Sequence, residues 1–383
     1  MSQSKFKATN LLAGTALVAL GVAVAGQASA DGHARVIKSG KDQTSLSISG
    51  HVSRQITIVD DGQTKVRHSD SDMSSSRIVI KGAGKINADM KVATKMEIAV
   101  DDARNGPARD GAVNGSRTGN DLQTRKTEMQ LSHKSFGTVW MGAGDMASNG
   151  SSENSFVTYA FLPGALNLIN GGAFRTATVS TGSGPNAAAR LVSEAFGQAD
   201  GLGRSTRVRY DTPVIAGFMA STSHNDGQEW DGALRYNGKI FDTKIKAAVS
   251  YGNGQTTEIY GGSIGLSHSS GLGAAYSYEY TNDDTQNDGA NGEDPSFHSA
   301  QLFYTSKFNE MGKTQFVYEH NNARNKEAAG EIATAHSFGI AQDIDAAAME
   351  IILRFSTAHL EADALGLDED DVNSLSIHTR VKF

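Results

Sequence analysis

Oily and polar side chains alternate strictly at the end of this chain, and no other feature of the sequence limits its fold as much. In residues 373–383 one set is Leu375, Ile377, Thr379, Val381 and Phe383, and the set between them is Ser374, Ser376, His378, Arg380 and Lys382. Successive side chains of a strand point to opposite faces, so one oily face and one wet, basic face are predicted. A soluble β-sandwich can show the same alternation. A strand that ends the chain on an aromatic residue fits a transmembrane β-barrel better, because its closing strand faces lipid on one side and water on the other.

The same period of two continues upstream, for example in residues 90–101 and 272–281. A helix would scatter the apolar residues of these segments around all sides. The pattern predicts an all-β protein, a transmembrane antiparallel β-barrel of about sixteen strands, which is wide enough for an aqueous channel. The strands are predicted to start near residues 46, 74, 90, 123, 137, 204, 217, 229, 243, 256, 272, 297, 313, 333, 346 and 373.

The first thirty residues have the organisation of a secretory signal peptide. Lys5 and Lys7 precede an apolar stretch at residues 11–25, and Ala28-Ser29-Ala30 is a cleavage pattern. We expect residues 1–30 to be removed and residues 31–383 to form the barrel. The alternative is an uncleaved membrane anchor, for which the apolar run is too short and too rich in glycine and alanine. The chain has no cysteine, which excludes disulfides and thiol chemistry, and its net charge of −7 argues against a nucleic-acid partner.

The connections between the expected strands alternate in length, short and then long, as periplasmic turns and outer loops of barrels do. One link, residues 145–203, is far longer than the others. Its apolar residues are typical of a buried segment: Phe156, Tyr159, Phe161, Leu162, Leu166, Leu168 and Ile169. We therefore expect this third outer loop to fold into the barrel. An outer flap or a subunit contact is the alternative.

Several segments carry a family resemblance. They are L-S-I-S-G-H-V-S-R-Q-I-T-I at residues 46–58, G-A-G-D-M-A-S-N-G at 142–150, R-S-T-R-V-R-Y at 204–210 followed by Asp211-Thr212-Pro213, and the terminal Phe383. Together they resemble the general, non-specific porins of Gram-negative bacteria, particularly the alphaproteobacterial type, over essentially the whole mature chain. The resemblance implies an outer-membrane location, a sixteen-stranded barrel, a homotrimer and an inward third loop that forms a constriction. It also implies that Phe383 is the signal for the barrel-assembly machinery.

Two features depart from the resemblance. The link at residues 145–203 is longer than the family's third loop, which leaves its path open. Arg54 has the parity of Ile48 and Val52, so we expect either a β-bulge in the first strand or a position for Arg54 at the rim.

Strand parity also predicts which charges line the lumen. The predicted basic pore wall consists of Arg77, Lys81, Lys95, Arg207, Arg209, Arg235, Arg354 and Arg380, and the predicted acidic constriction loop carries Asp145, Glu153, Glu194 and Asp200. A basic wall opposite an acidic loop would create a transverse field that orients water and charged solutes. The alternative is that these charges only solvate the lumen and pair locally. The sign of ion selectivity stays open.

The sequence therefore predicts a passive diffusion channel for ions and small hydrophilic solutes, with outer-membrane lipid and lipopolysaccharide as surroundings. The alternatives are a barrel enzyme of the lipase or protease type and a surface adhesin. No spacing of serine, aspartate and histidine singles out a catalytic pair, so no catalytic residue and no cofactor is predicted. The acidic outer loops at residues 282–294 and 367–371 could hold Ca²⁺ or Mg²⁺. However, Pro295 occupies the twelfth position of the one EF-hand-like register, so solvated loop charge is favoured.

Overall fold

The computed structural model describes residues 35–38, 44–71, 73–100, 122–163, 169, 171–174, 190–283, 294–326, 330–362 and 371–383. The expected signal peptide, Leu166, Leu168 and most of the two acidic outer loops lie outside these residues. Within the described part of the chain, no helix is long and apolar enough to cross a membrane.

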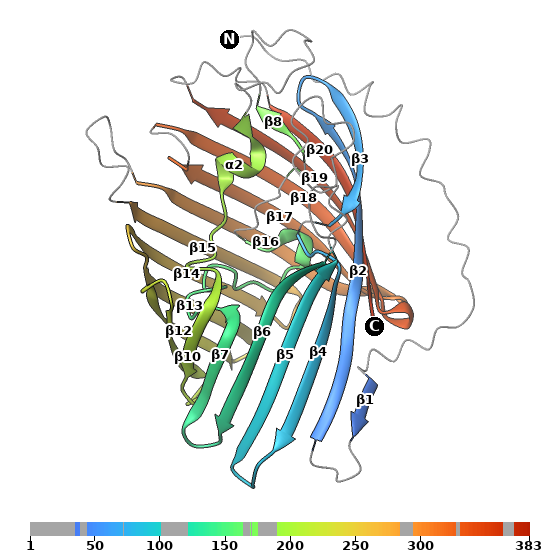
Figure 1. Ribbon diagram of the computed structural model, residues 1–383. Coiled ribbons are helices and arrows are strands. Elements are labelled where there is room, and N and C mark those ends of the chain that lie inside the picture. The colour runs from blue at the N-terminus through green and yellow to red at the C-terminus, as the bar shows by residue number, and fades with distance from the viewer. Residues whose placement is uncertain are drawn as a thin grey trace.

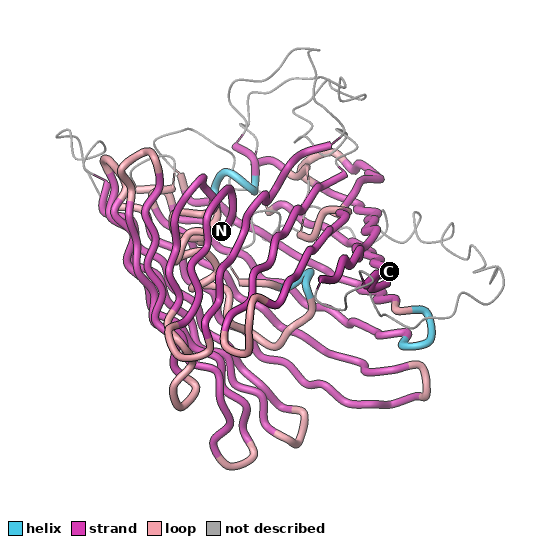
Figure 2. Tube along the Cα trace, turned by 60° about the horizontal axis from the view of Figure 1, so that its bottom comes forward, coloured by secondary structure: helices cyan, strands magenta, loops and turns pink. Residues whose placement is uncertain are grey.

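The strands close into an antiparallel barrel with sixteen positions in its wall (Figures 1 and 2). The barrel strands are β2 (Thr44–Asp60), β3 (Thr64–Asp70), β4 (Arg77–Lys85), β5 (Met90–Val100), β6 (Leu122–His133), β7 (Gly137–Asp145), β10 (Arg204–Asp211), β11 (Phe218–Asn225), β12 (Trp230–Ile240), β13 (Thr243–Asn253), β14 (Thr257–His268), β15 (Leu272–Asp283), β16 (Ser296–Asn309), β17 (Gly312–Arg324), β18 (Ile332–Ile344), β19 (Met349–Glu361) and β20 (Val372–Lys382). A short additional strand, β1 (Arg35–Lys38), also pairs with β2. The predicted fold class and strand count are confirmed.

The first and last barrel strands close the wall. β2 pairs with β20 from His51 opposite Lys382 to Asp60 opposite Asn373. At the end of the chain, the Gly50 N–H donates to the Phe383 carbonyl at 2.9 Å and the Phe383 N–H donates to the Gly50 carbonyl at 3.0 Å. A Cβ at Gly50 would lie 2.7 Å from Cζ of the Phe383 ring, so the terminal aromatic packs where only glycine fits.

The second wall position is interrupted, which the sequence pattern did not predict. β3 pairs with the far part of β2 and β4 with the near part. β4, which begins at Arg77, is the strand expected near residue 74, and β3 was not expected. Between them the chain turns around buried Asp70, whose carboxylate accepts hydrogen bonds from the Ser71 N–H at 2.8 Å and the Ser76 N–H at 2.8 Å. Arg54 is exposed beside this break, opposite Asp70 and Thr379. The register of β2 is continuous there, so the expected bulge does not occur.

Side chains sort by parity onto two faces. On β2, Ile48, Val52 and Ile56 are exposed on the outer face, while Ser53, Gln55 and Thr57 face inward and are buried. The barrel strands β3–β7 and β10–β20 repeat this pattern, as an apolar exterior and a polar interior require.

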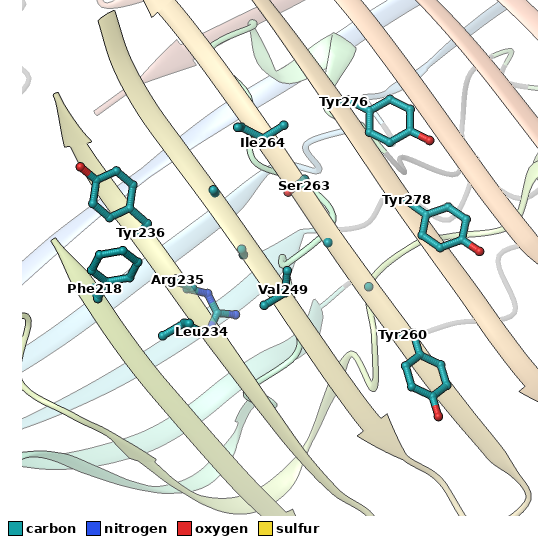
Figure 3. A pocket seen from close by; sticks show the side chains of 14 residues that line it. Phe218, Leu234, Arg235, Tyr236, Val249, Tyr260, Ser263, Ile264, Tyr276 and Tyr278 are labelled. Atoms are coloured by element: carbon teal, nitrogen blue, oxygen red, sulfur yellow. The ribbon is translucent and has the colours of Figure 1, made fainter. Parts of the chain in front are cut away.

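The outer face is not uniform. Aromatic side chains are exposed on β10–β18: Tyr210, Phe218, Trp230, Tyr260, Tyr276, Tyr304, Phe308, Phe316 and Phe338. No aromatic residue occurs within β2, β4, β5, β6 or β20. The aromatic side also carries two shallow apolar grooves. The first, of about 530 Å³, lies between Phe218 and Tyr236 on one side and Tyr260 and Tyr276 on the other (Figure 3).

Candidate functional site

The residues that follow β7 lie across the inner face of the barrel. The Ser148 N–H donates to Asp231 at 2.6 Å, the Asn154 N–H to Ser263 Oγ at 2.9 Å, and the Thr158 N–H to the Gln315 side chain at 2.8 Å. Ser155 Oγ donates to Gln301 at 2.7 Å. These acceptors belong to β12, β14, β16 and β17 in turn. Residues 146–161, here called the inner segment, therefore cross the inward side chains of successive strands.

The inner segment ends in a short 3₁₀ helix, η2 (Tyr159–Phe161), that is fully packed. Phe161 is buried with Phe303, Val317 and Ile352. The Arg354 guanidinium lies over the Phe161 ring at 4.6 Å, donates to the Ala160 carbonyl, and pairs with Glu319 at 2.8 Å. A Cβ at Gly339 would collide with the Phe161 ring, so this close approach requires glycine there. The apolar residues predicted to seek burial do so at Tyr159, Phe161 and Ile169.

Tyr159 contacts the closing seam of the barrel. The Arg380 guanidinium lies 3.9 Å from the centre of the Tyr159 ring, and the His378 ring meets it edge-on at 6.4 Å. Arg380 also donates to Glu350 at 2.7 Å. Both Arg380 and His378 come from β20, which extends the contacts of the inner segment as far as the closing strand.

The part of the long link that leads back to the barrel wall is also packed against other residues. α2 (Val192–Phe196) contacts β17 and β18 (Figure 1), and Val192 and Phe196 are buried with residues of the upper barrel, including Phe297 and Leu360. Glu194 is a structural residue of this turn, because its carboxylate accepts from the Leu191 N–H at 3.1 Å. A two-stranded ribbon, β8 (Ala173–Phe174) and β9 (Arg190–Leu191), precedes the helix.

Three predicted wall arginines bind main-chain carbonyl groups at the start of the inner segment. Arg235 donates to the carbonyls of Ala147 at 2.6 Å and Asn149 at 2.9 Å. Arg209 donates to the Met146 carbonyl at 3.0 Å. Arg207 is buried, donates to the Asp145 carbonyl at 3.0 Å and pairs with Glu128 at 2.5 Å. A guanidinium group is suited to binding several carbonyl groups, because its N–H donors lie in one plane and point in different directions.

The inner face of β4 and β5 is different, because its cations stay open. Lys81 lies directly opposite Lys95, and Lys85 lies opposite Lys91. Like charges in direct cross-strand pairs are unfavourable, so this arrangement is not explained by stability. Lys95 has a partner in Glu97 at 2.8 Å, whereas among the described residues Lys81, Lys85 and Lys91 are exposed and have no carboxylate partner. These four lysines are here called the lysine ladder.

The ladder borders a polar cavity of about 530 Å³ inside the barrel. Its lining includes Lys81, Lys95, Lys126, Arg207, Arg209, Asp145 and Trp140. Arg77 lies at the end of the ladder and pairs with Glu97 at 3.0 Å, as does Arg125 at 2.9 Å. One carboxylate thus serves three cations, and the cavity wall keeps an excess of positive charge.

The predicted loop acids bind mainly to other groups than the wall arginines. Asp145 pairs with Lys126. Asp200 accepts from the Gly150 N–H at 3.0 Å and from the Asn149 side chain at 3.0 Å. Burial, with Asp200 and Asp145 nearby, raises the pKa of Glu153 to about 8, so this carboxyl is protonated at neutral pH. Burial also raises the pKa of Asp200.

The contacts between arginines and carbonyl groups were beyond the reach of the sequence. A search of the sequence for opposite charges finds carboxylates as partners for the arginines. It does not find main-chain carbonyls, because every residue has one and no residue type marks the carbonyl that is bound. The inward parity of Arg207, Arg209, Arg235 and Arg354 was the available signal, and it gave the direction of each side chain without its partner.

A closed barrel with an apolar exterior, a polar interior and a cation-lined cavity defines a transmembrane β-barrel with an aqueous lumen. A model of the Gram-negative porin family matches residues 13–376. The chain therefore belongs to the Gram-negative porin family. It is an outer-membrane diffusion channel.

Several solved structures share the fold of this chain. The anion-selective porin from Comamonas acidovorans has a TM-score of 0.59 at 14% identity, over 89% of this chain and 100% of that one. OmpT, an outer membrane protein of Vibrio cholerae, has a TM-score of 0.59 at 13% identity, over 91% and 100%. The outer membrane channel DcaP of Acinetobacter baumannii has a TM-score of 0.57 at 11% identity, over 91% and 99%. No curated protein matches the chain.

Proposed function

We propose that this channel passes ions and small hydrophilic solutes by passive diffusion and selects them by size and charge where the inner segment crosses the lumen. The contacts of residues 146–161 with β12, β14, β16 and β17 carry this proposal, since they hold main chain inside the barrel at a fixed position. The width of the pore and the electric field inside it then select the solutes, and no catalytic group is required.

We propose further that the channel prefers anions. Lys81 lines the inner cavity, and Lys85 and Lys91 are exposed where β4 turns into β5. None of the three has a carboxylate partner among the described residues, while the inward acids Glu97, Glu128 and Glu319 are buried in ion pairs. A paired, buried acid contributes little field to the lumen, whereas an open lysine contributes a full charge. Of the predicted wall residues, Lys81, Lys95 and Arg77 would then act on solutes, and Arg207, Arg209, Arg235 and Arg354 would hold the segment.

Planar-bilayer recordings of the purified protein test both statements. We expect ohmic channels whose reversal potential in a KCl gradient has the sign of an anion preference. Removal of residues 154–198 should raise single-channel conductance, with heat-modifiable gel mobility as the check that the barrel has formed. An equal or lower conductance in a folded barrel would place the constriction elsewhere.

We propose that the side of the barrel formed by β20, β2, β4, β5 and β6 is the contact surface of a homotrimer; Phe383, which follows β20 directly, is the exposed aromatic residue on it. Aromatic belts mark the parts of a membrane protein that face lipid at its interfaces, and β20, β2, β4, β5 and β6 lack them. Ile48→Trp should therefore disrupt the trimer by a steric clash. Ile340→Trp is the matched control, because Ile340 on β18 is equally exposed, at 44%, on the aromatic side. Trimers of unchanged yield in both variants on native gels would refute the assignment.

We also propose that Phe383 is recognised by the barrel-assembly machinery. Deletion of Phe383 should reduce the amount of assembled protein in the cell. Because the ring also packs on Gly50, refolding of the purified variant into detergent is the necessary comparison. Loss in the cell with normal refolding supports a signal, whereas loss in both shows only a packing role.

A further inference from the structure

We propose that His320 and His336, on the outer face of β17 and β18, form a binding site for one divalent transition-metal ion such as Zn²⁺ or Cu²⁺. The two residues are direct cross-strand partners in the register of these strands. Their ring centres are 4.8 Å apart, and both side chains are half-buried. Imidazole nitrogen is a preferred ligand of Zn²⁺ and Cu²⁺ in proteins.

The separation of the two rings fits binding to a single ion. A metal ion lies about 2.0–2.1 Å from an imidazole nitrogen, which places it about 3.2 Å from the centre of the ring. Two rings bound at an angle between square-planar and tetrahedral therefore have centres about 4.5–5.2 Å apart. The observed 4.8 Å between His320 and His336 lies in this range. The paired strands thus hold the two rings at the required distance before an ion arrives.

A hydrogen bond prepares His336 for a metal ion. The Tyr318 hydroxyl lies 3.0 Å from Nδ1 of His336. When Nδ1–H donates to the hydroxyl oxygen, the lone pair of Nε2 is free, and Nε2 has no partner in the part of the chain that the structure describes. A metal-bound histidine usually donates its other N–H to a fixed acceptor, which sets the tautomer and the direction of the ring. Tyr318 supplies that acceptor here.

Nδ1 of His320 is a buried polar atom without an explanation in the fold. No described residue gives it a hydrogen bond. Burial of such an atom removes its bonds to water without a replacement, and an ion is one of the partners that can supply it. An ion held between the two rings would bind this nitrogen and leave Nε2–H of His320 for water. The assigned ligand atoms are therefore Nδ1 of His320 and Nε2 of His336.

The histidine pair lies where an ion can reach it from water. On one side of the pair, Tyr318 and Phe338 border the second apolar groove of the outer face, of about 640 Å³. On the other side, towards the connection at residues 325–331, the next outward side chains are the polar Asn322 and Thr334. Aromatic residues are typical of a membrane interface, so the pair lies at the aqueous edge of the apolar band.

Two protein ligands make this an open site. Among the residues that the structure describes, no group of three or more His, Cys, Asp or Glu side chains is arranged to hold a metal ion. Water would complete the coordination of the bound ion. Because the two ligands come from neighbouring strands, the ion would bind the folded barrel and not the separated strands. Its binding should therefore stabilise the barrel.

Isothermal titration calorimetry with Zn²⁺ tests the site on the purified, untagged barrel in detergent, after treatment with a chelator. His320→Gln and His336→Gln should each weaken Zn²⁺ binding by at least about tenfold. Tyr318→Phe should weaken it by roughly tenfold, because loss of the partner that orients a ligand typically has this effect. Heat-modifiable gel mobility checks that each variant has folded. Unchanged Zn²⁺ binding in both histidine variants would overturn the proposal, and so would unchanged binding in Tyr318→Phe if neither histidine variant folds.

His224→Gln is the matched control. His224 is exposed on the outer face of β11, where its direct cross-strand neighbours are Val208 and Trp230 instead of a second histidine. Its replacement should leave Zn²⁺ binding unchanged. A loss as large as that in His336→Gln would mean that single surface histidines bind the ion, which would overturn a site made by the pair.

Thermal unfolding tests whether the ion joins both strands. Zn²⁺ should raise the unfolding temperature of the unaltered protein, and the rise should increase with the Zn²⁺ concentration above the dissociation constant. Either single variant, His320→Gln or His336→Gln, should lose most of this rise. A rise of equal size in the unaltered protein and in both variants would assign the stabilisation to other groups and overturn the proposal.

Discussion

On the inner face of β4 and β5, lysines are exposed and stand opposite one another, whereas on the inner face of β10–β19, arginines of the same parity are covered by the inner segment. Lys81 has no carboxylate partner among the described residues. Arg354 is 1% exposed, bonded to Ala160 and paired with Glu319. The same sequence signal, an inward cation on a strand, therefore leads to two structural roles.

The difference lies in what covers each side chain. Where main chain crosses the wall, guanidinium groups satisfy its carbonyls, because an unpaired buried carbonyl is costly. Where nothing crosses, a cation remains in water and acts on solutes. Identical parity therefore predicts exposure to the lumen only on strands that the inner segment does not reach.

The inner face of β10–β19 is here called the covered half of the wall, and the inner face of β4 and β5 the open half. The largest expected effect is on the covered half. Arg354→Met leaves Glu319 buried without its partner, so the free energy of unfolding should fall by about 3–5 kcal/mol. Urea unfolding of the refolded protein, followed by the fluorescence of Trp140 and Trp230, measures this loss. The released inner segment should also raise single-channel conductance.

Two further variants complete this test. Arg354→Met with Glu319→Leu should recover part of the lost stability, because no unpaired charge remains. Lys81→Met on the open half should change stability by less than about 0.5 kcal/mol. A loss of similar size at Lys81 and Arg354 would contradict the division of the wall into two halves.

The second effect is on the open half. Lys81→Glu reverses one charge beside the cavity, which at about 8 Å in water amounts to roughly 1 kcal/mol for each ion, unfavourable for the anion and favourable for the cation. The ratio of anion to cation permeability should therefore fall about thirtyfold. Reversal potentials in a KCl gradient report this ratio. Arg235→Gln, on the covered half, should leave the ratio nearly unchanged. A larger shift from Arg235→Gln would mean that the covered arginines face solutes after all.

The smallest effect is a pH dependence that comes from the inner segment. With a pKa of about 8, Glu153 is protonated at pH 7 and gains a negative charge as the pH rises through 8. The ratio of anion to cation permeability should therefore decrease between pH 7 and pH 9, by roughly fivefold for one added charge at a similar distance of about 8 Å. Glu153→Gln should remove this decrease. An equal decrease in Glu153→Gln would assign it to another group.

Much of the barrel was predictable because its signal is local. The expected strand starts lie within three residues of the observed ones for β2, β5–β7 and β10–β20. The break between β3 and β4 was missed because it depends on Asp70 binding the main chain of residues 71 and 76, which no alternation reports. Arg54, on an apolar parity, led to the prediction of a β-bulge in β2 or a position at the rim, and the bulge does not occur because the register of β2 is continuous there. The irregularity lies in the neighbouring strand and not in its own.

The candidate site was less predictable, because its contacts join residues that are distant in the sequence and a local alternation does not report them. Parity correctly placed Arg207 and Arg235 inward but gave no sign that they bind carbonyls of residues 142–149. Glu194 was predicted to be a constriction acid, and nothing in the sequence indicated that its carboxylate accepts from the Leu191 N–H. The apolar residues of the long link, such as Phe161, did indicate burial, because transfer of an aromatic side chain from water is favourable wherever it packs.

The sequence by itself determined that the strands have an oily and a wet face, because side-chain direction alternates with every residue of a strand. It thereby determined a lipid-facing exterior and a charged interior. Only the tertiary structure decided which inward charges stay open to solutes. Whether an inward cation stays open depends on where residues 146–161, distant in the sequence, cross the inner face of the wall. The sequence does not mark those contacts, because every residue has the same main-chain carbonyl group.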